Sequence, residues 1–321
     1  MLTRNRRVLV SVLDWGLGHA TRTSVIVGRL RERGCEVILA GSGRSLELLG
    51  ADYPELERVW LPGFSPRLSS GRRQWWKIGL QVPWFLWCVW RERRMTERIV
   101  RERGVELIVS DNRYGVRSVG CGSVIVTHQL RPKIGVRGLG WLERFVGWVI
   151  RRWVGRFDGC LVPDVRVGGL SGELSGGRWE GMRVHGVGLL SRVALSEATE
   201  EGEVEWLGIV SGPEPQRGML ERELVERFCG ESGRRVVVCG RGVGMGEDGV
   251  VEGGVERVCQ ADGGRLKGLI MSARHIVCRA GYSTIMDLVA LGREAELIAT
   301  PGQGEQEYLV KRMGEIWGER E

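Results

Sequence analysis

The sequence contains no C-x-x-C pair and no histidine at zinc-ligand spacing from a cysteine. Several of its eight cysteines lie inside apolar, strand-like runs such as "RRVVVCG" (234–240) and "HIVCRAG" (275–281). Thiols scattered in this way are typical of buried, reduced cysteines, and they are not typical of a disulfide framework. The sequence therefore predicts a cytoplasmic protein without zinc sites or disulfide bonds.

A secretory leader and a run long enough to span a bilayer are also lacking. Residues 1–7 lead directly into a strand pattern, and the most apolar stretch, within 72–104, is interrupted by Pro83 and flanked by charge. Short internal repeats and low-complexity tracts are missing as well. These absences predict a globular protein that stays inside the cell.

The chain has the length and apolar content to build two cores. Its 321 residues are 42% hydrophobic, which is enough for two domains of ordinary size. The formal net charge is +7, and this excess of arginine and lysine favours phosphates, nucleic acid or an anionic membrane as partners. Charge balance alone leaves these three classes of partner open.

Short β-rich runs alternate with segments of helical length in both halves of the chain. Strands that are apolar on both faces and alternate with helices imply parallel sheets covered on both sides. The predicted strands lie at 6–13, 35–40, 57–63, 105–111, 123–128, 158–164, 205–212, 234–240, 274–281 and 295–302. The prediction is an α/β fold of two doubly wound domains, 1–188 and 189–321, with 186–205 as the connector.

The stretch "VLVSVLDWGLGHATRTSVIVGRL" (8–30) is a candidate ligand-binding turn. We predict a strand at 8–13, a turn at 14–19 and a helix at 21–33. In a doubly wound sheet, ligands bind beyond the carboxyl ends of the strands, where this turn lies. Gly16 and Gly18 let the backbone approach a ligand, and the helix start offers N–H groups to an anion. A tight turn without a ligand is the alternative.

His19 and Asp111 are the candidate catalytic pair. A histidine at a helix N-terminus tends to be neutral and can accept a proton. The strand ending in "IVSD" supplies Asp111, and the usual strand order 3-2-1-4-5 makes the first and fourth strands neighbours. We therefore expect Asp111 beside His19 as the acid that orients a base. In the alternative, Asp111 is the base and His19 binds the acceptor.

A second candidate site follows a strand in the other half of the chain. "RHIVCRAGYSTIMDLVALG" (274–292) predicts a strand, a glycine-containing turn and a helix. Gly281, Ser283 and Thr284 would present donors to a pyrophosphate at the helix start, and Arg279 would neutralise a leaving diphosphate. An ordinary N-capped helix start is the alternative.

A series of short motifs runs in order over nearly the whole chain and resembles one known family. The motifs are "GLGHATR" (16–22), "SDNRYG" (110–115), "THQL" (127–130), "VPD" (162–164), "GLLSR" (188–192), "SGPEPQR" (211–217), "RAGYSTIMDL" (279–288) and "PGQGEQEYL" (301–309). Together they are similar to the GT-B glycosyltransferases related to the peptidoglycan GlcNAc transferase, that is, to glycosyltransferase family 28.

The resemblance implies a fold, a reaction and a separate role for each domain. It implies two Rossmann-like domains facing a cleft, with the acceptor in the N-terminal domain and the donor mainly in the C-terminal one. The reaction would be inverting transfer of a hexose or N-acetylhexosamine from a nucleotide sugar, most often UDP-linked, to a hydroxyl acceptor. Neither a metal nor a cofactor is implied, and the lack of a D-x-D motif after a strand agrees. Because this chain stops at "KRMGEIWGERE", a donor domain without the family's final helix is expected.

The remaining candidate residues lie at positions that match motifs of this family. By resemblance, Asp287 would accept hydrogen bonds from the ribose hydroxyls, and Gly212 would lie near the phosphates. The loop and helix start at 301–309 would contact the donor sugar, with a solvated acidic helix start as the alternative. The glycine-rich 240–249 has no clear helix after it and is predicted to be a loop. The sugar contacts would be Gln303, Glu305 and Gln306, and the acceptor or phosphate loop would comprise Gly16, Gly18, Asn112, Arg113 and His128.

Two segments combine tryptophan with arginine, namely 72–104 and 140–157. This composition is typical of surfaces that sit at lipid headgroups. The functional interpretation is peripheral attachment to the inner face of the plasma membrane, serving a lipid-linked acceptor. In the alternative, the tryptophans belong to the core and the arginines form a solvated face.

Rival functions share parts of this pattern. A UDP-sugar 2-epimerase has the same architecture and needs no acceptor. A non-catalytic protein that binds a nucleotide sugar or a membrane is another alternative. Nucleic-acid binding is disfavoured, because the arginines lie beside tryptophans in apolar helices and not in an RNA-binding motif.

Overall fold

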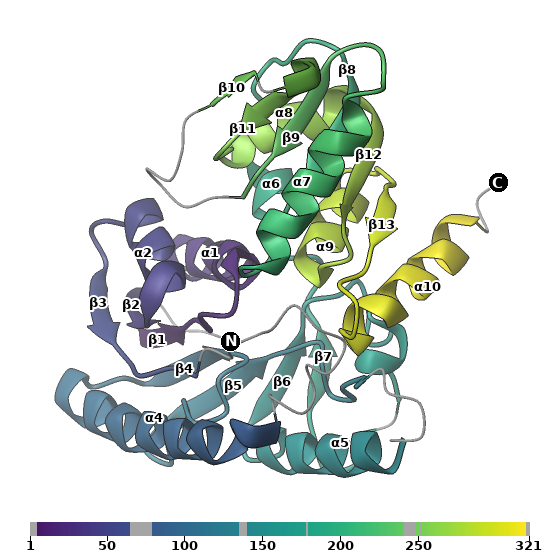
Figure 1. Cartoon of the computed structure of the whole chain (residues 1–321). Helices are drawn as coiled ribbons and strands as arrows, with labels where there is room; N and C mark the ends of the chain where they lie inside the picture. The colour runs from purple at the N-terminus through teal and green to yellow at the C-terminus, as the bar shows by residue number, and fades with distance from the viewer. Residues whose placement is uncertain are drawn as a thin grey trace. The chain divides into compact units, whose positions relative to one another are not determined.

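The computed structural model describes residues 5–64, 79–134, 140–177, 179–240, 248–250 and 252–318 (Figure 1). These residues form two compact units that divide between Leu190 and Ser191. Each unit has its own parallel sheet and its own hydrophobic core. The chain is thus built from two α/β units.

The first unit contains a seven-stranded sheet in the order β3-β2-β1-β4-β5-β6-β7, and every neighbouring pair is parallel. The order 3-2-1-4-5 is confirmed, and β1 lies directly beside β4. In sequence order the strands are Arg7–Ser11 (β1), Glu36–Gly41 (β2), Glu57–Trp60 (β3), Leu107–Asp111 (β4), Gly122–Val126 (β5), Gly159–Val162 (β6) and Val184–Gly186 (β7).

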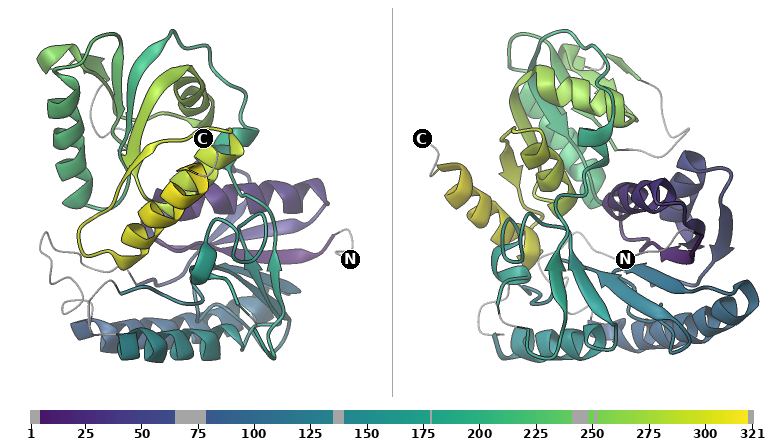
Figure 2. Two further views of the ribbon diagram at one scale, coloured as in Figure 1. Left: turned by 90° about the vertical axis from the view of Figure 1, so that its right-hand side faces the viewer. Right: turned by 180° about the vertical axis from the view of Figure 1, so that it is seen from behind.

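Helices cover both faces of this sheet, because its strands are apolar on both faces (Figure 1). In β1, Val8 and Val10 pack in one core with α1 and α2, whereas Leu9 packs on the opposite face with α4. Figure 2 shows α4 and α5 side by side on the second face. The helices span Leu17–Glu32 (α1), Gly43–Asp52 (α2), Val82–Arg103 (α4) and Gly140–Val154 (α5), with a 3-10 turn at Gly172–Leu174 (η1).

The second unit contains a six-stranded sheet in the order β10-β11-β9-β8-β12-β13, in which only the pair β10 and β11 is antiparallel. Its strands are Val204–Ile209 (β8), Arg235–Val238 (β9), Gly249–Val250 (β10), Glu256–Val258 (β11), Ala273–Arg279 (β12) and Glu296–Ile298 (β13). Its helices are Arg192–Leu195 (α6), Gln216–Phe228 (α7), Gly263–Ser272 (α8), Tyr282–Ala290 (α9) and Gly304–Gly318 (α10), with a 3-10 turn at Glu252–Gly254 (η2).

Several local expectations were wrong or fall outside the described residues. The first helix begins at Leu17 and not at Thr21, so the expected turn is shorter. The predicted connector 186–205 includes the short helix α6. Most of the predicted glycine-rich loop, 241–247, lies outside the described residues. The eight cysteines are free, but Cys229 is exposed and does not follow the expectation of burial.

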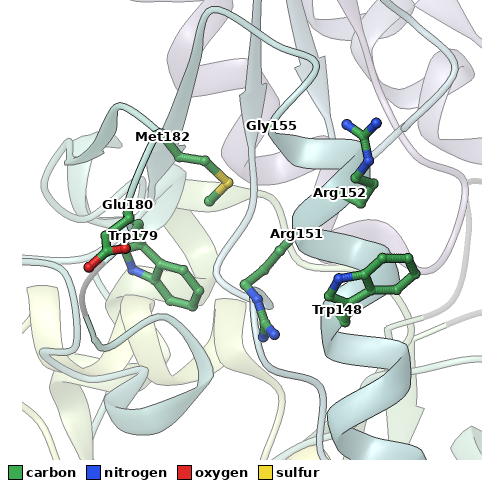
Figure 3. Close-up of a pocket in the computed structure, with 8 residues that line it drawn as sticks. Trp148, Arg151, Arg152, Gly155, Trp179, Glu180 and Met182 are labelled. Carbon is green, nitrogen blue, oxygen red and sulfur yellow. The ribbon is translucent and has the colours of Figure 1, made fainter.

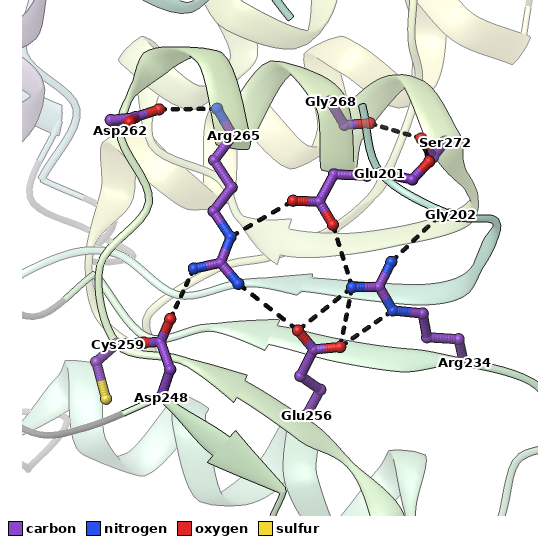
Figure 4. A network of polar contacts seen from close by, with 10 residues as sticks. All are labelled: Glu201, Gly202, Arg234, Asp248, Glu256, Cys259, Asp262, Arg265, Gly268 and Ser272. Carbon is purple, nitrogen blue, oxygen red and sulfur yellow. Dashed lines mark hydrogen bonds and ion pairs between the residues drawn. The ribbon is translucent and has the colours of Figure 1, made fainter. Parts of the chain in front are cut away.

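A network of alternating charges ties together elements at one end of the second sheet (Figure 4). Arg234, the residue before β9, contacts Glu201 at 3.1 Å and Glu256 on β11 at 2.9 Å. Arg265 on α8 contacts Asp248 at 2.6 Å and also reaches Glu201 and Glu256. Single exposed ion pairs contribute little to stability, whereas a network of this kind contributes more. Arg234 and Arg265 therefore help to stabilise the second unit.

Candidate functional site

The candidate site in the first unit begins at the carboxyl end of β1. Gly16 caps α1 with a φ of 91°, which a side chain rarely tolerates, and helix α1 starts at the next residue. Gly18 lies inside the first turn of α1, so Gly16 is the residue of the pair that needs glycine for its backbone. This tight entry puts His19 in the first turn of α1, above the sheet edge where ligands of such folds bind.

His19 and Asp111 lie in contact, as the strand order predicts. His19 Nδ1 is 3.0 Å from Asp111 Oδ1, and Asp111 is the last residue of β4. The His19 side chain is 15% exposed and that of Asp111 is 1% exposed. Because Nδ1 is engaged inside the unit, Nε2 is the imidazole nitrogen that can meet a substrate.

Two further residues complete this cluster, and the sequence analysis missed both. Arg22 Nε donates to Asp111 Oδ2 at 2.8 Å, Arg22 Nη2 donates to Oδ1, and Thr23 Oγ1 donates to Oδ2 at 2.8 Å. The Arg22 side chain is 2% exposed. The signal was present in "GLGHATR", since residues three apart on a helix share a face and His19 and Arg22 are so spaced.

The charges of this cluster set its protonation states. Burial raises the pKa of Asp111, but Arg22 and then His19 outweigh burial and hold that pKa below its usual range. Burial, followed by the Arg22 charge, lowers the pKa of His19, and Asp111 offsets only part of this. The pair at neutral pH is therefore a carboxylate beside a neutral imidazole.

Two residues of the predicted acceptor loop, His128 and Asn112, lie near this cluster. His128 follows β5, is buried, and lies close enough to His19 to lower its pKa. Asn112 has a φ of 54°, and its N–H donates to the Val126 carbonyl at 3.0 Å. Both therefore lie at the sheet edge that carries His19.

Arg113 does not lie free in the predicted acceptor loop. It is 2% exposed, and its guanidinium donates to Glu92 on α4 at 3.0 and 3.1 Å. It also donates to the backbone carbonyls of Val12, Leu61 and Pro62. Because these bonds join the ends of three chain segments, we assign Arg113 to the fold and correct the expectation that it binds a ligand.

In the second unit, the predicted donor residues gather at the carboxyl ends of two neighbouring strands. Ile209 of β8 pairs with Cys278 of β12, so the loops that follow them are adjacent. A Cβ added at Gly281 would lie 3.8 Å from Ser211 Oγ and 3.7 Å from Thr284 Oγ1. Gly281 caps α9 without a side-chain hydrogen bond, so the positive end of the α9 dipole lies at this edge.

Other donor candidates lie around the same edge. Gly212 has a φ of 104°, and a Cβ added there would lie 3.8 Å from Arg279 Cδ. Ser283 lies in the first turn of α9. Gln303 precedes α10, and Glu305 lies in the first turn of that helix. The side chain of Gln306 is used locally, because its Oε1 accepts from the Thr300 N–H at 2.7 Å.

Arg279, like Arg113, is buried and hydrogen-bonded inside its own unit. It is 5% exposed, its Nη2 donates to the Gln216 carbonyl at 2.8 Å, and its Nη1 contacts Thr300 Oγ1. Burial lowers its pKa. We therefore correct the expectation that Arg279 contacts the leaving diphosphate, since its guanidinium joins the start of α7 to the segment after β13.

Asp287 lies one turn into α9 and has a partner that the sequence analysis missed. Ser191 Oγ donates to Asp287 Oδ1 at 2.6 Å and accepts from the Ala194 N–H, which caps α6. Burial raises the pKa of Asp287 to about 7, although the Ser191 bond acts in the opposite direction. This carboxyl group therefore changes charge near neutral pH.

Most tryptophans of α4 and α5 lie on the surface, which overturns the core alternative for them, whereas Trp153 of α5 packs against Phe85 and Tyr114. Trp84, Trp87 and Trp90 on α4 are 54%, 40% and 51% exposed. Arg94 lies over the ring of Trp90 at 4.3 Å. On α5 the exposed aromatic side chains are Trp141, Phe145 and Trp148. Trp75 and Trp76 lie outside the described residues.

A pocket of about 430 Å³ opens beside the exposed ring of Trp148. Figure 3 shows Arg151 and Arg152 of α5 on one side of it and Trp179 and Met182 on the other. Glu180 also lines the pocket. Among the residues that the structure describes, no helix is long and apolar enough to cross a membrane. No cluster of three His, Cys, Asp or Glu side chains suited to a metal occurs there either.

Comparison with known proteins identifies the fold. No protein-family model and no curated protein sequence matches the chain. Among solved structures, the glycosyltransferase SnogD from Streptomyces nogalater is 17% identical over 97% of this chain and 96% of its own, with a TM-score of 0.55. Acinetobacter baumannii MurG is 10% identical over 98% of this chain and 91% of its own, with a TM-score of 0.52.

A plant protein gives the same result. Phytolacca americana UGT2, solved with UDP-2fluoro-glucose and pterostilbene, is 16% identical over 98% of this chain and 84% of its own, with a TM-score of 0.59. The chain therefore has the GT-B fold, and the predicted fold class is confirmed. The resemblance seen in the motifs is confirmed at the level of the fold.

Proposed function

We propose that the protein is an inverting glycosyltransferase that moves a hexose or N-acetylhexosamine from a UDP-sugar to a hydroxyl acceptor. The observation that carries the proposal is the His19–Asp111 contact at the first βα turn of a GT-B fold. A neutral imidazole with an ionised carboxylate on Nδ1 is suited to accept a hydroxyl proton. The UDP-2fluoro-glucose held by Phytolacca americana UGT2 supports the choice of donor.

The chemistry is a single displacement. Nε2 of His19 takes the proton of the acceptor hydroxyl while the acceptor oxygen bonds to the anomeric carbon. The bond from that carbon to the diphosphate oxygen breaks, UDP leaves with the electron pair, and the anomeric configuration inverts. Asp111 stabilises the imidazolium that forms. Asp111 is buried and accepts from Arg22 and Thr23, which supports His19 rather than Asp111 as the base.

On the donor side, the start of α9 would bind the pyrophosphate. Gly281, Thr284 and the dipole of α9 supply positive partial charge at the β8 and β12 strand ends. Arg279 is left out of direct contact because its guanidinium is buried in the fold. Asp287 would accept hydrogen bonds from the ribose hydroxyls in its carboxylate form.

The function is tested by mixing the purified protein with a panel of UDP-sugars and hydroxyl acceptors. We expect UDP release that depends on the acceptor, with a product of inverted anomeric configuration. Conversion of the sugar without any acceptor would instead identify a 2-epimerase. UDP binding without turnover of any donor would contradict the enzymatic proposal.

Asp287 gives donor binding a defined pH dependence. Its pKa of about 7 means that the carboxylate forms as the pH rises, so affinity for a UDP-sugar should increase from about pH 6 to about pH 8. Asp287→Asn should bind about tenfold more weakly at the upper end and lose this dependence. Isothermal titration calorimetry across the range measures both effects.

Asp262→Asn is the matched control for this experiment. Asp262 caps α8 in the same unit, and asparagine is an equally good N-cap, so this variant loses one charge and keeps the fold. It should bind UDP-sugars as the wild type does. An unchanged pH dependence in Asp287→Asn would remove Asp287 from the donor site.

We further propose that the acceptor is lipid-linked and that α4 and α5 contact the inner face of the plasma membrane. Exposed tryptophans beside arginines suit the headgroup region, where both indole rings and cationic side chains interact favourably with lipids. Arg151 and Arg152 line the pocket beside the exposed ring of Trp148, so two positive charges lie next to an indole that could enter the headgroup region. The contact is peripheral.

The membrane proposal is tested by flotation with vesicles. Wild-type protein should bind mixed phosphatidylglycerol and phosphatidylcholine vesicles and bind pure phosphatidylcholine weakly. Arg151→Gln/Arg152→Gln should partition about ten- to thirtyfold less, at about 1 kcal/mol for each charge. Arg33→Gln/Arg44→Gln removes the same charge from exposed sites outside α4 and α5 and should change partitioning little. Equal losses in the two variants would contradict a specific surface.

A further inference from the structure

The imidazole of His19 faces two partners that make opposite demands on one nitrogen. Its Nδ1 is 3.0 Å from Asp111 Oδ1 and 2.8 Å from Arg22 Nη2. A carboxylate only accepts hydrogen bonds and a guanidinium only donates them. Nδ1 of a neutral imidazole carries a proton or a lone pair, so it can satisfy one of these partners at a time.

The two arrangements have different chemical consequences. When Nδ1–H donates to Asp111, Nε2 carries the lone pair and can act as a base. When Arg22 donates to Nδ1, the ring proton is on Nε2, which then only donates. A doubly protonated ring would place Nδ1–H against the guanidinium, where both groups are cationic. Arg22 therefore opposes the imidazolium, while the carboxylate of Asp111 favours it.

Arg22 is held where it can exert this effect. Its side chain is buried and bonds both carboxylate oxygens of Asp111. It thus neutralises the acid that would otherwise raise the proton affinity of the ring. Three charged or titratable groups act on the imidazole, and each comes from a different part of the first unit. These are Arg22 from α1, Asp111 from β4 and His128 from the segment after β5.

We propose that Arg22 is a positioning residue that sets the proton affinity of His19 by bonding Asp111 and contacting Nδ1. The guanidinium keeps the ring neutral at pH values where a histidine paired with aspartate alone would already be protonated. It also fixes the Asp111 oxygens so that one remains against Nδ1. The consequence for turnover rests on the proposed role of His19 as the base, whereas the effect on proton affinity does not.

The test is a pH titration of the histidine side chains by NMR in protein labelled with ¹⁵N-histidine. The chain has four histidines, and His19→Gln assigns the signal of His19. In Arg22→Met, His19 should titrate about one pH unit or more above its wild-type value, because Asp111 then acts unopposed. The acid limb of the pH profile of kcat/KM for UDP release should move upward by the same amount.

Arg113→Met is the matched control, because Arg113 is likewise a buried arginine that bonds a buried carboxylate. It should destabilise the protein in the same way but leave the titration of His19 in place. Unchanged titration in Arg22→Met, or an equal shift in Arg113→Met, would overturn the proposal. The titration needs no substrate. Failure of this proposal can therefore be distinguished from failure of the wild-type protein to release UDP.

A second comparison covers the case in which Arg22→Met does not fold. Arg22→Met/Asp111→Asn carries no unpaired buried charge, whereas Asp111→Asn alone retains the guanidinium. His19 should titrate about one unit higher in the double variant than in Asp111→Asn. Identical titration in these two variants would contradict the proposal.

Discussion

His19→Ala is expected to reduce UDP release about 10²- to 10⁴-fold without changing the affinity for a UDP-sugar. The variant removes the proton acceptor and leaves Asp111 bonded to Arg22 and Thr23, so the buried carboxylate keeps its partners. Because the His19 side chain is 15% exposed while Asp111, Arg22 and Thr23 are buried, the fold should persist. A coupled assay for UDP release measures turnover, and calorimetry with the UDP-sugar measures affinity.

His185→Ala supplies the control for this prediction. His185 lies on β7 at the edge of the same sheet and is exposed, so its loss removes an imidazole without touching the cluster. It should retain wild-type turnover. If His19→Ala also turned over at the wild-type rate, His19 could not be the base.

Arg113→Met is expected to lower the free energy of unfolding by about 3–5 kcal/mol. The substitution leaves Glu92 buried without its ion pair, and Glu92 is 5% exposed. It also removes the donors to the Val12, Leu61 and Pro62 carbonyls. Since whole domains have stabilities of about 5–15 kcal/mol, such a loss is large. Urea unfolding followed by tryptophan fluorescence measures it.

The double variant Arg113→Met/Glu92→Leu separates the lost ion pair from the lost packing. With both charges gone, no uncompensated carboxylate remains, and most of the stability should return. A double variant as unstable as Arg113→Met would show that the carbonyl contacts, and not the ion pair, account for the effect.

The sequence predicted the parts of the site that follow from strand order. The alternation of apolar runs with helical segments predicted parallel sheets, and the order 3-2-1-4-5 is the usual one for a doubly wound sheet. Because β1 and β4 are then neighbours, His19 and Asp111 had to meet at their carboxyl ends. The short strands β7, β10 and β11 were missed, since their two or three residues lie in no continuous apolar run, unlike the equally short β13.

The roles of the arginines could not be predicted in this way. The motifs predict ligand contacts for Arg113 and Arg279, whereas both are buried and bond carbonyls or side chains of their own unit. No motif assigns a role to Arg22, which contacts both members of the candidate pair. A long side chain can reach many neighbours, so its partner is decided by which distant segments pack around it.

By itself, then, the sequence determined the two α/β units, the order of the strands and the meeting of His19 with Asp111. These features depend on hydrophobic periodicity and on local rules for connecting strands, which act over neighbouring elements. Only the tertiary structure decided which charges are buried, which tryptophans of α4 and α5 are exposed, and that Arg22 joins the pair. Burial depends on contacts between residues far apart in the chain, and no local pattern encodes them.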